Sequence, residues 1–200
     1  MNFLAHIYLS GDNDLITIGN FMADGIKGTR YLKFPPDIQK GIILHRAIDT
    51  FTDAHPIVKK STRRLHKKYS HYSGVIVDIL YDHFLAKNWD QYHPQPLADY
   101  VANFYQMLDE NFELLTPRIQ KMVPFMVADN WLLSYAEIEG IAKVLYGMNR
   151  RTKNRSGMDR AVKELELHYS EFEEEFTLFF KELEEFCAKR LAEIHLEIQI

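Results

Sequence analysis

Residues 45–56, HRAIDTFTDAHP, hold two histidines and two aspartates threaded between apolar side chains. Successive residues of a helix are rotated by about 100°, so side chains four positions apart lie nearly above one another. His45, Asp49 and Asp53 have this spacing and would line one side of a helix. Imidazole and carboxylate groups accept protons and bind divalent cations, so this face could support acid–base chemistry or a metal site.

The segment VDILYDHFL, residues 77–85, carries a second group of the same kinds of residue. Asp78 and Asp82 are four apart, and His83 follows directly. Two helices that each carry carboxylates and a histidine could face each other across a pocket, which is how helical bundles build metal sites. A set of imidazoles and carboxylates without thiolate suits Mn²⁺, Fe²⁺ or Zn²⁺, and a carboxylate-rich set favours Mn²⁺ or Mg²⁺.

Each residue of these two groups also has a structural interpretation. Asp53 could cap the helix that Pro56 introduces, and His83 lies about 100° around the helix from Asp82. The groups together are harder to explain in this way, because buried carboxylates are unfavourable unless they are paired or bind a metal. Arg46 is the only lysine or arginine of the first segment, so few cations lie nearby to pair them.

Two further polar residues stand out near the N-terminus. His6 lies in the apolar run FLAHIYL, where a histidine is more often a hydrogen-bonded core residue. Asp24 ends the run IGNFMAD and precedes Gly25, which is typical of the end of a helix. Neither residue indicates a site when it is taken alone.

The composition limits the classes of protein to which the chain can belong. Its 200 residues suit one domain, and 46% hydrophobic residues are enough for a sizeable core. A formal net charge of -4 argues against general nucleic-acid binding, which needs a basic surface. Cys187 is the only cysteine, which excludes an internal disulfide and a cysteine-rich zinc site. Because no signal peptide or membrane span is recognisable, we expect a soluble cytoplasmic protein.

The elements that would position these side chains are helices. Apolar residues recur at spacings of three and four in several segments, and prolines mostly separate these segments. No long alternation of apolar and polar residues indicates a sheet. The sequence therefore predicts a single all-α domain over residues 1–200, a helical bundle of about eight helices. Residues 1–150 would supply the metal-site helices, and residues 158–200 would form a C-terminal helical segment packed on them.

Five separated blocks of the chain agree with a known family in order and spacing: MNFLAHIYLS, GNFMADGIKG, GIILHRAIDTFTDAHP, VDILYDHFLAKNW and VLYGMNRR. They resemble the acyl carrier protein phosphodiesterase family, also called acyl carrier protein hydrolase, a divergent relative of the all-α HD-domain metal phosphohydrolases. The resemblance implies an HD-domain-like fold and a metal-dependent enzyme, with Mn²⁺ as the expected ion. Its reaction would be hydrolysis of the phosphodiester between 4′-phosphopantetheine and a serine of holo-acyl carrier protein, which leaves apo-acyl carrier protein.

The resemblance also suggests roles for individual residues. The metal ligands would be Asp24, His45, Asp49 and Asp82, with His83 or His6 as the next candidates. The residues that orient water or move protons would be His6, Asp53, Asp78 and His83, with His55 as a further candidate for the general acid. The phosphate would be held by Lys27, Arg150 and Arg151.

A net-negative enzyme needs a local basic surface to meet an acidic carrier protein. The segment KKSTRRLHKK, residues 59–68, provides a basic stripe whose cations repeat at a spacing of four in two rows: Lys59, Arg63 and Lys67, and Lys60, Arg64 and Lys68. Arg63, Arg64 and Lys67 are the residues that we expect to contact the partner. The simplest alternative is an ordinary solvated helix face. RNA is a less suitable partner, because no aromatic residues that could stack on bases interrupt the stripe.

Two other functions remain open at this point. The first is an HD-like phosphohydrolase that acts on a nucleotide or another small phosphate ester, which would need a deep and closed pocket. The second is a non-catalytic helical module that binds acidic proteins through the basic stripe, in which case the carboxylates would bind no metal.

Overall fold

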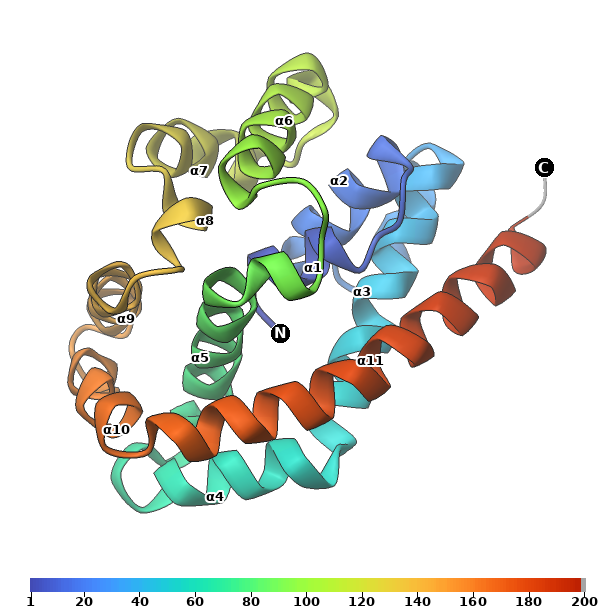
Figure 1. Cartoon of the computed structure of the whole chain (residues 1–200). Coiled ribbons are helices and arrows are strands. Elements are labelled where there is room, and N and C mark those ends of the chain that lie inside the picture. The colour runs from blue at the N-terminus through green and yellow to red at the C-terminus, as the bar shows by residue number, and fades with distance from the viewer. Residues whose placement is uncertain (199–200) are drawn as a thin grey trace.

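The computed structural model describes residues 1–198, and all regular elements in that range are helices (Figure 1). They comprise eleven α-helices and six short 3₁₀-helices, which confirms the predicted all-α class. Eight of the α-helices have nine or more residues, as many as the sequence predicts. The other three, α1, α8 and α10, have four to six residues and are too short for apolar periodicity to indicate them.

The helices follow one another without long irregular segments. The α-helices are α1 Phe3–Tyr8, α2 Asp14–Met22, α3 Pro36–Ala54, α4 Pro56–Tyr69, α5 Ser73–Lys87, α6 Leu97–Glu110, α7 Pro117–Ala128, α8 Trp131–Ser134, α9 Ile138–Arg151, α10 Val162–Leu167 and α11 Tyr169–Glu197. The 3₁₀-helices are η1 Ala23–Gly25, η2 Gly28–Lys33, η3 Ser70–Tyr72, η4 Trp89–Gln91, η5 Phe112–Leu114 and η6 Met158–Arg160. Prolines at the first turns of α3, α4 and α7 fix a helical φ where no backbone donor is needed.

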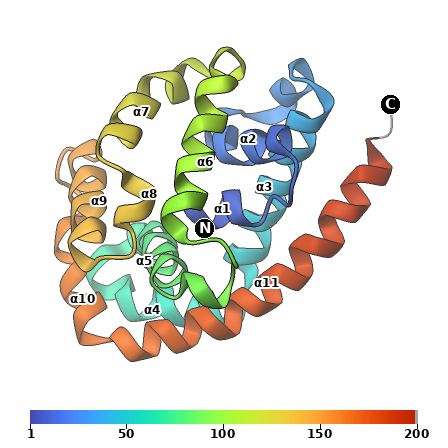
Figure 2. The same ribbon diagram turned by 45° about the horizontal axis from the view of Figure 1, so that its top comes forward.

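Helix α5 lies at the centre of the fold, in contact with α1, α4, α9 and α11 (Figures 1 and 2). Its residues from Ile79 to Ala86 are all buried, so the helix has no solvent-exposed side there. A helix that is apolar on all sides is stable only in the interior of a protein. The polar residues of α5 therefore need specific partners, because an unpaired buried polar group is destabilising.

Helices α2 and α3 pack closely because each has a glycine at their contact. A Cβ atom on Gly19 would lie 2.3 Å from the backbone oxygen of Ile38, and one on Gly41 would lie 2.1 Å from the backbone oxygen of Ile16. Both distances are far shorter than any real Cβ contact, so only glycine permits this approach. The close packing brings the end of α2 next to the middle of α3, where the first polar group of the sequence lies.

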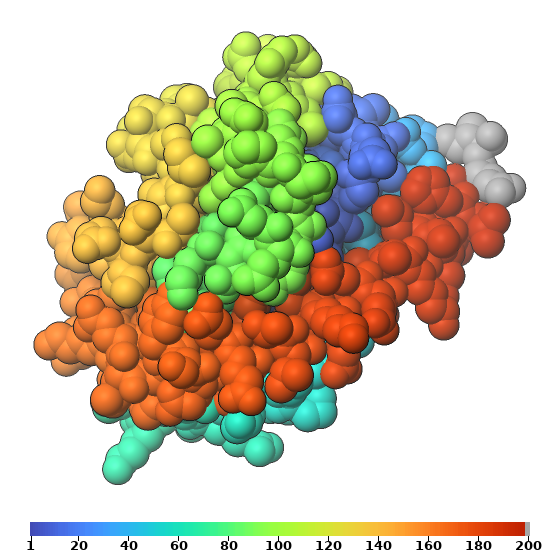
Figure 3. Space-filling model, in the orientation of Figure 1, coloured from blue at the N-terminus to red at the C-terminus, as the bar shows by residue number. Residues whose placement is uncertain are grey.

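Helix α11 has 29 residues and lies against α3, α4 and α5. In Figures 1 and 3 it crosses the front of the molecule as one long ridge above α4. Its phenylalanines at positions 172, 176, 179 and 180 are fully buried and form the apolar side of the helix. None of the helices in residues 1–198 combines the length and the apolar character needed to span a bilayer.

Candidate functional site

Three side chains from two helices come together near the N-terminus of the chain. Asp49, on α3, has one carboxylate oxygen 3.4 Å from Nε2 of His6 and the other 3.2 Å from Nε2 of His45. The two imidazole rings are stacked with their centroids 4.0 Å apart. One donor atom from each residue lies within 4.8 Å of the other two, a spacing that could hold a metal ion. We call these three residues the His–Asp cluster.

Asp24 lies at the edge of the His–Asp cluster. It belongs to η1, directly after α2, and its Oδ1 is 3.4 Å from Nε2 of His45. The structure therefore brings together Asp24, His45 and Asp49, three of the four ligands expected from the sequence. His6, a further candidate ligand and a candidate for proton transfer, faces the same carboxylate as His45.

Asn20, a fully buried residue of α2, holds both histidine rings from behind. Its side-chain amide donates to the His6 backbone oxygen at 2.8 Å and to Oγ of Ser10 at 2.9 Å, which turns its Oδ1 towards His6. Nδ1 of His6 donates to this Oδ1 at 2.8 Å, and Nδ1 of His45 donates to the Asn20 backbone oxygen, also at 2.8 Å. With a proton fixed on each Nδ1, both Nε2 atoms face Asp49.

The two histidines of the His–Asp cluster differ in protonation. Burial and the neighbouring His45 lower the pKa of His6 to about 4, so His6 is neutral at pH 7. Its Nε2 is buried and has no hydrogen-bond partner among residues 1–198. Burial alone would lower the pKa of His45, but hydrogen bonds to Asp24 and Asp49 raise it to about 9. Burial also opposes ionisation of Asp49, yet the hydrogen bond from His45 and the nearby ammonium of Met1 hold its pKa well below the usual range.

The amino group of Met1 also lies at this site. It is 3.1 Å from Oδ1 of Asp78, on α5, and 3.7 Å from Oδ1 of Asp49. Burial alone would lower the pKa of this amino group, but the attraction of Asp78 and Asp49 raises it. Burial raises the pKa of Asp78 in spite of the nearby ammonium.

The site opens onto a pocket of about 700 Å³. Five aspartates line it: Asp24, Asp49, Asp53, Asp78 and Asp129. Its apolar lining residues are Phe3, Val75, Ile79, Trp131, Val144 and Met148. Two cations of α9, Lys143 and Arg151, also line it. A pocket that combines apolar walls with a few polar groups is typical of a site for an organic ligand.

Asp82 does not lie in the His–Asp cluster, so its expected place there is corrected. Its two carboxylate oxygens accept hydrogen bonds from the backbone N–H groups of Leu4 at 2.7 Å and Ala5 at 3.3 Å. These N–H groups belong to the first turn of α1, where a helix lacks internal acceptors and favours a negative charge. Asp82 thus holds the helix that carries His6, and burial raises its pKa to about 7 in spite of these two donors.

His83 and His55 also lie outside the pocket. Nδ1 of His83 donates to the Tyr135 backbone oxygen, and its Nε2 bonds with the Tyr169 hydroxyl, both at 2.8 Å. Nδ1 of His55 accepts from the Ile57 backbone N–H at 3.3 Å and caps α4, a role that the sequence suggested for Asp53. Both ring nitrogens of His83 are used by the protein, so the structure gives it no free atom for proton transfer.

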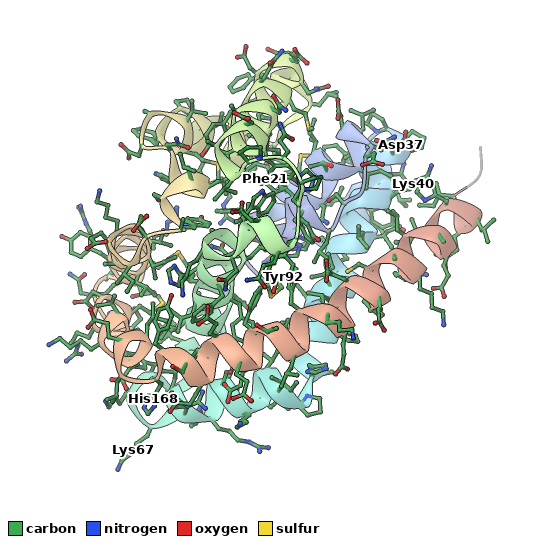
Figure 4. All side chains as sticks on the ribbon, viewed as in Figure 1. Phe21, Asp37, Lys40, Lys67, Tyr92 and His168 are labelled. Carbon is green, nitrogen blue, oxygen red and sulfur yellow. The ribbon has the colours of Figure 1, made fainter. Side chains whose placement is uncertain are left out.

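The basic stripe on α4 divides into two rows with different surroundings. The row with Arg64 faces α11, and Arg64 forms two hydrogen bonds of 2.7 and 2.6 Å with the buried carboxylate of Glu175. Lys60 and Lys68 also pair with glutamates of the C-terminal segment. The expectation that Arg64 contacts a partner is therefore corrected. Arg63 and Lys67 are exposed and form no ion pair within residues 1–198, and Lys67 extends away from the molecule in Figure 4.

The cations expected to hold phosphate are also only partly at the pocket. Arg151 lines it, whereas Arg150 and Lys27 are exposed residues outside its lining. Lys143 lines the pocket but was missed by sequence reasoning, although it lies eight residues before Arg151 on the same helix face. Asn20 was missed too; its only signal is its position four residues before Asp24.

The chain is similar to known proteins over most of its length. Residues 1–183 match the sequence model of a family described as acyl carrier protein phosphodiesterase. Proteins with this name from Yersinia pestis, Photorhabdus laumondii and Pectobacterium atrosepticum are 34%, 33% and 32% identical over 181 residues. These alignments cover 90% of this chain and 94%, 91% and 94% of the relatives. No solved structure matches the chain.

Proposed function

The chain belongs to the acyl carrier protein phosphodiesterase family, and we propose that it hydrolyses the phosphodiester between 4′-phosphopantetheine and a serine of holo-acyl carrier protein. The products are apo-acyl carrier protein and the free prosthetic group, so the chain is a hydrolase. The structural observation that carries this proposal is the His–Asp cluster beside a pocket that Asp49 lines and that is large enough for an organic group.

We further propose that the cluster binds a divalent cation through His6, His45 and Asp49, with Asp24 as an additional ligand. The donor set supports this, because imidazoles and carboxylates without thiolate suit first-row divalent ions. The buried Nε2 of His6, which has no hydrogen-bond partner in residues 1–198, supports it more strongly. A cation would give this lone pair a partner and would replace the proton that His45 shares with the two carboxylates. Mn²⁺ as the physiological ion stays a prediction.

The residues of the pocket can then be given tasks. When bound, a divalent cation screens the charge of the phosphodiester and lowers the pKa of water at the site. Asn20 keeps both Nε2 atoms directed towards Asp49. Asp78 lines the pocket with a pKa raised by burial, and Asp53 lies one turn after Asp49, so either can orient a water molecule. Lys143 and Arg151, on α9, provide positive charge that can attract the phosphate of the substrate.

The experiment that tests the function is incubation of holo-acyl carrier protein with the purified protein and Mn²⁺, followed by mass spectrometry of the carrier protein. We expect loss of the phosphopantetheine group, and no loss after chelation of the metal. Hydrolysis of nucleotides or small phosphate esters with an intact carrier protein would favour the small-substrate alternative. No hydrolysis at all and no bound metal would favour a non-catalytic binding module.

We also propose where the carrier protein docks. The exposed row of α4, with Arg63 and Lys67, is available to an acidic carrier protein. The absence of a nucleic-acid partner and the cytoplasmic location stay predictions from charge and composition.

A further inference from the structure

One face of α9 lines the pocket through residues spaced by four. Lys143, Gly147 and Arg151 lie on this face, each about one turn after the one before. Val144 and Met148 lie beside them and add apolar surface. The pocket side of α9 therefore consists of two cations at its ends, a glycine between them, and an apolar border.

Gly147 is not required by the backbone or by packing. It lies inside α9 and is not among the glycines with positive φ. A Cβ atom built on it would meet no heavy atom within 4 Å. Gly140, on the same helix, differs, because its Cβ would lie 1.8 Å from the Ser134 backbone oxygen. Glycine weakens the interior of an exposed helix relative to alanine, so at position 147 the helix is weakened without any contact that demands it.

The missing side chain of Gly147 leaves space in the pocket. The residue is exposed and lines the pocket, so any side chain at this position would project into the pocket or across its mouth. Val144, Met148 and Trp131 also line the pocket and give it apolar surface. A flexible chain with methylene and amide groups has the chemistry that such a surface binds.

We propose that the Lys143–Arg151 face of α9 is the subsite for the pantetheine arm, and that Gly147 determines specificity by leaving room for it. This inference rests on the proposed function, because it takes the arm from the proposed substrate. In this arrangement the arm lies over Gly147 against Val144 and Met148. One of the two flanking cations attracts the phosphate at one end of the arm.

A graded series of variants tests the subsite. Gly147→Ala, Gly147→Val and Gly147→Leu fill the space in steps. Gly74 provides the matched control, because its Cβ also meets no heavy atom within 4 Å, it lies in α5, and it does not line the pocket. Binding of 4′-phosphopantetheine, the free product, is measured by calorimetry, and catalytic efficiency is measured for holo-acyl carrier protein and for bis(p-nitrophenyl) phosphate.

We expect Gly147→Leu to weaken binding of 4′-phosphopantetheine at least tenfold and to lower the ratio of the two catalytic efficiencies at least tenfold. Gly74→Leu should change neither quantity more than twofold. Gly147→Ala should raise the melting temperature by about 2–4 °C while it lowers efficiency with holo-acyl carrier protein, since alanine strengthens the helix but enters the subsite. If Gly147 had only a structural role, its substitution would not raise stability and lower activity towards holo-acyl carrier protein at the same time.

The inference is overturned if Gly147→Leu binds 4′-phosphopantetheine as tightly as Gly74→Leu does. Retention of Mn²⁺ by Gly147→Leu, measured by electron paramagnetic resonance, shows that the metal site has survived the substitution. Failure of the wild-type protein to act on holo-acyl carrier protein strikes the proposed function instead. The binding comparison with the free product still decides the subsite in that case.

Discussion

At the scale of single residues, Asn20 connects the fold to the chemistry of the site. Its side-chain oxygen and its backbone oxygen each accept a proton from Nδ1 of one histidine, so one residue sets the tautomer of two rings. Groups that orient metal-binding histidines in this way commonly change metal affinity about 10–100-fold when they are removed. The site is therefore prepared before any cation binds.

We expect Asn20→Ala to weaken Mn²⁺ binding about 10–100-fold, because His6 loses the acceptor that directs its Nε2 towards Asp49. The measurement is an electron paramagnetic resonance titration of free Mn²⁺. Asn149→Ala is the matched control, since Asn149 is another buried asparagine whose side chain orders Ser156 and Gly157 away from the cluster. Equal Mn²⁺ affinity in both variants would show that Asn20 has only a structural role.

His45 should make the stability of the metal-free protein depend on pH. Its pKa is 6.5 when unperturbed and about 9 in the fold, because hydrogen bonds to Asp24 and Asp49 outweigh burial. A raised pKa stabilises the fold fully below the unfolded value, and this contribution is lost as the pH rises through the folded value. We therefore expect the melting temperature in chelator to fall between pH 6.5 and 9.

The comparison that isolates this effect is His45→Gln, which cannot be protonated. Its melting temperature should change much less over the same pH range, as followed by circular dichroism. If the wild type and His45→Gln had the same slope, His45 would not carry the shared proton in the metal-free protein.

At the scale of elements, the close contact of α2 and α3 places Asn20 beside His45. The contact depends on Gly19 and Gly41, because a Cβ at either position would strike backbone atoms of the opposite helix. The 2.8 Å bond from Nδ1 of His45 to the Asn20 backbone oxygen exists only at this separation of the helices.

We expect Gly41→Ala to lower the free energy of unfolding by about 1–3 kcal/mol and to weaken Mn²⁺ binding, because the added Cβ forces α2 away from α3. Urea unfolding measures the first effect. Gly74→Ala is the control, since its Cβ would meet no atom within 4 Å. Gly41→Ala with wild-type stability would mean that the two helices adjust freely.

The two rows of α4 should respond differently to mutation. Arg63→Glu combined with Lys67→Glu should raise KM for holo-acyl carrier protein, most clearly at low salt, and leave the free energy of unfolding unchanged. An unchanged KM in the double variant at low salt would exclude the row with Arg63 and Lys67 as the docking surface.

Arg64→Ala should lower the free energy of unfolding by about 1–3 kcal/mol, because it removes two hydrogen bonds from the buried carboxylate of Glu175.

The sequence predicts contacts within one helix better than contacts between helices. His45 and Asp49 were placed together correctly in space, because a spacing of four fixes their relation on α3. Asp82 was misplaced, because α5 is buried on all sides and periodicity cannot tell which neighbour each side faces. Its partners Leu4 and Ala5 are 78 and 77 residues away. Arg64 was misplaced for the same reason, since Glu175 is 111 residues away.

At the scale of the whole molecule, the pocket is assembled from segments far apart along the chain. Met1 precedes α1 and Phe3 is its first residue. Asp49 comes from α3, Asp78 from α5, and Arg151 from α9. All these segments lie in the part of the chain that matches the family, residues 1–183. The all-α class followed from apolar periodicity alone, whereas the pocket depends on how eleven helices in residues 1–198 pack, which periodicity does not encode.

The central claim is that the His–Asp cluster binds the cation on which hydrolysis depends, and Asp49→Asn tests it most directly. The exchange keeps the size of the side chain and removes the negative charge that both histidines face. Asp53→Asn is the matched control, since Asp53 lies one turn further along the same pocket wall without contacting the cluster.

The decisive measurement is the Mn²⁺ dissociation constant of the wild type, Asp49→Asn and Asp53→Asn, determined on folded protein by electron paramagnetic resonance and paired with turnover of holo-acyl carrier protein. We expect Asp49→Asn to bind Mn²⁺ at least about 100-fold more weakly than the wild type and to release no phosphopantetheine, while Asp53→Asn keeps its Mn²⁺ affinity. Wild-type Mn²⁺ affinity and turnover in Asp49→Asn would contradict the account.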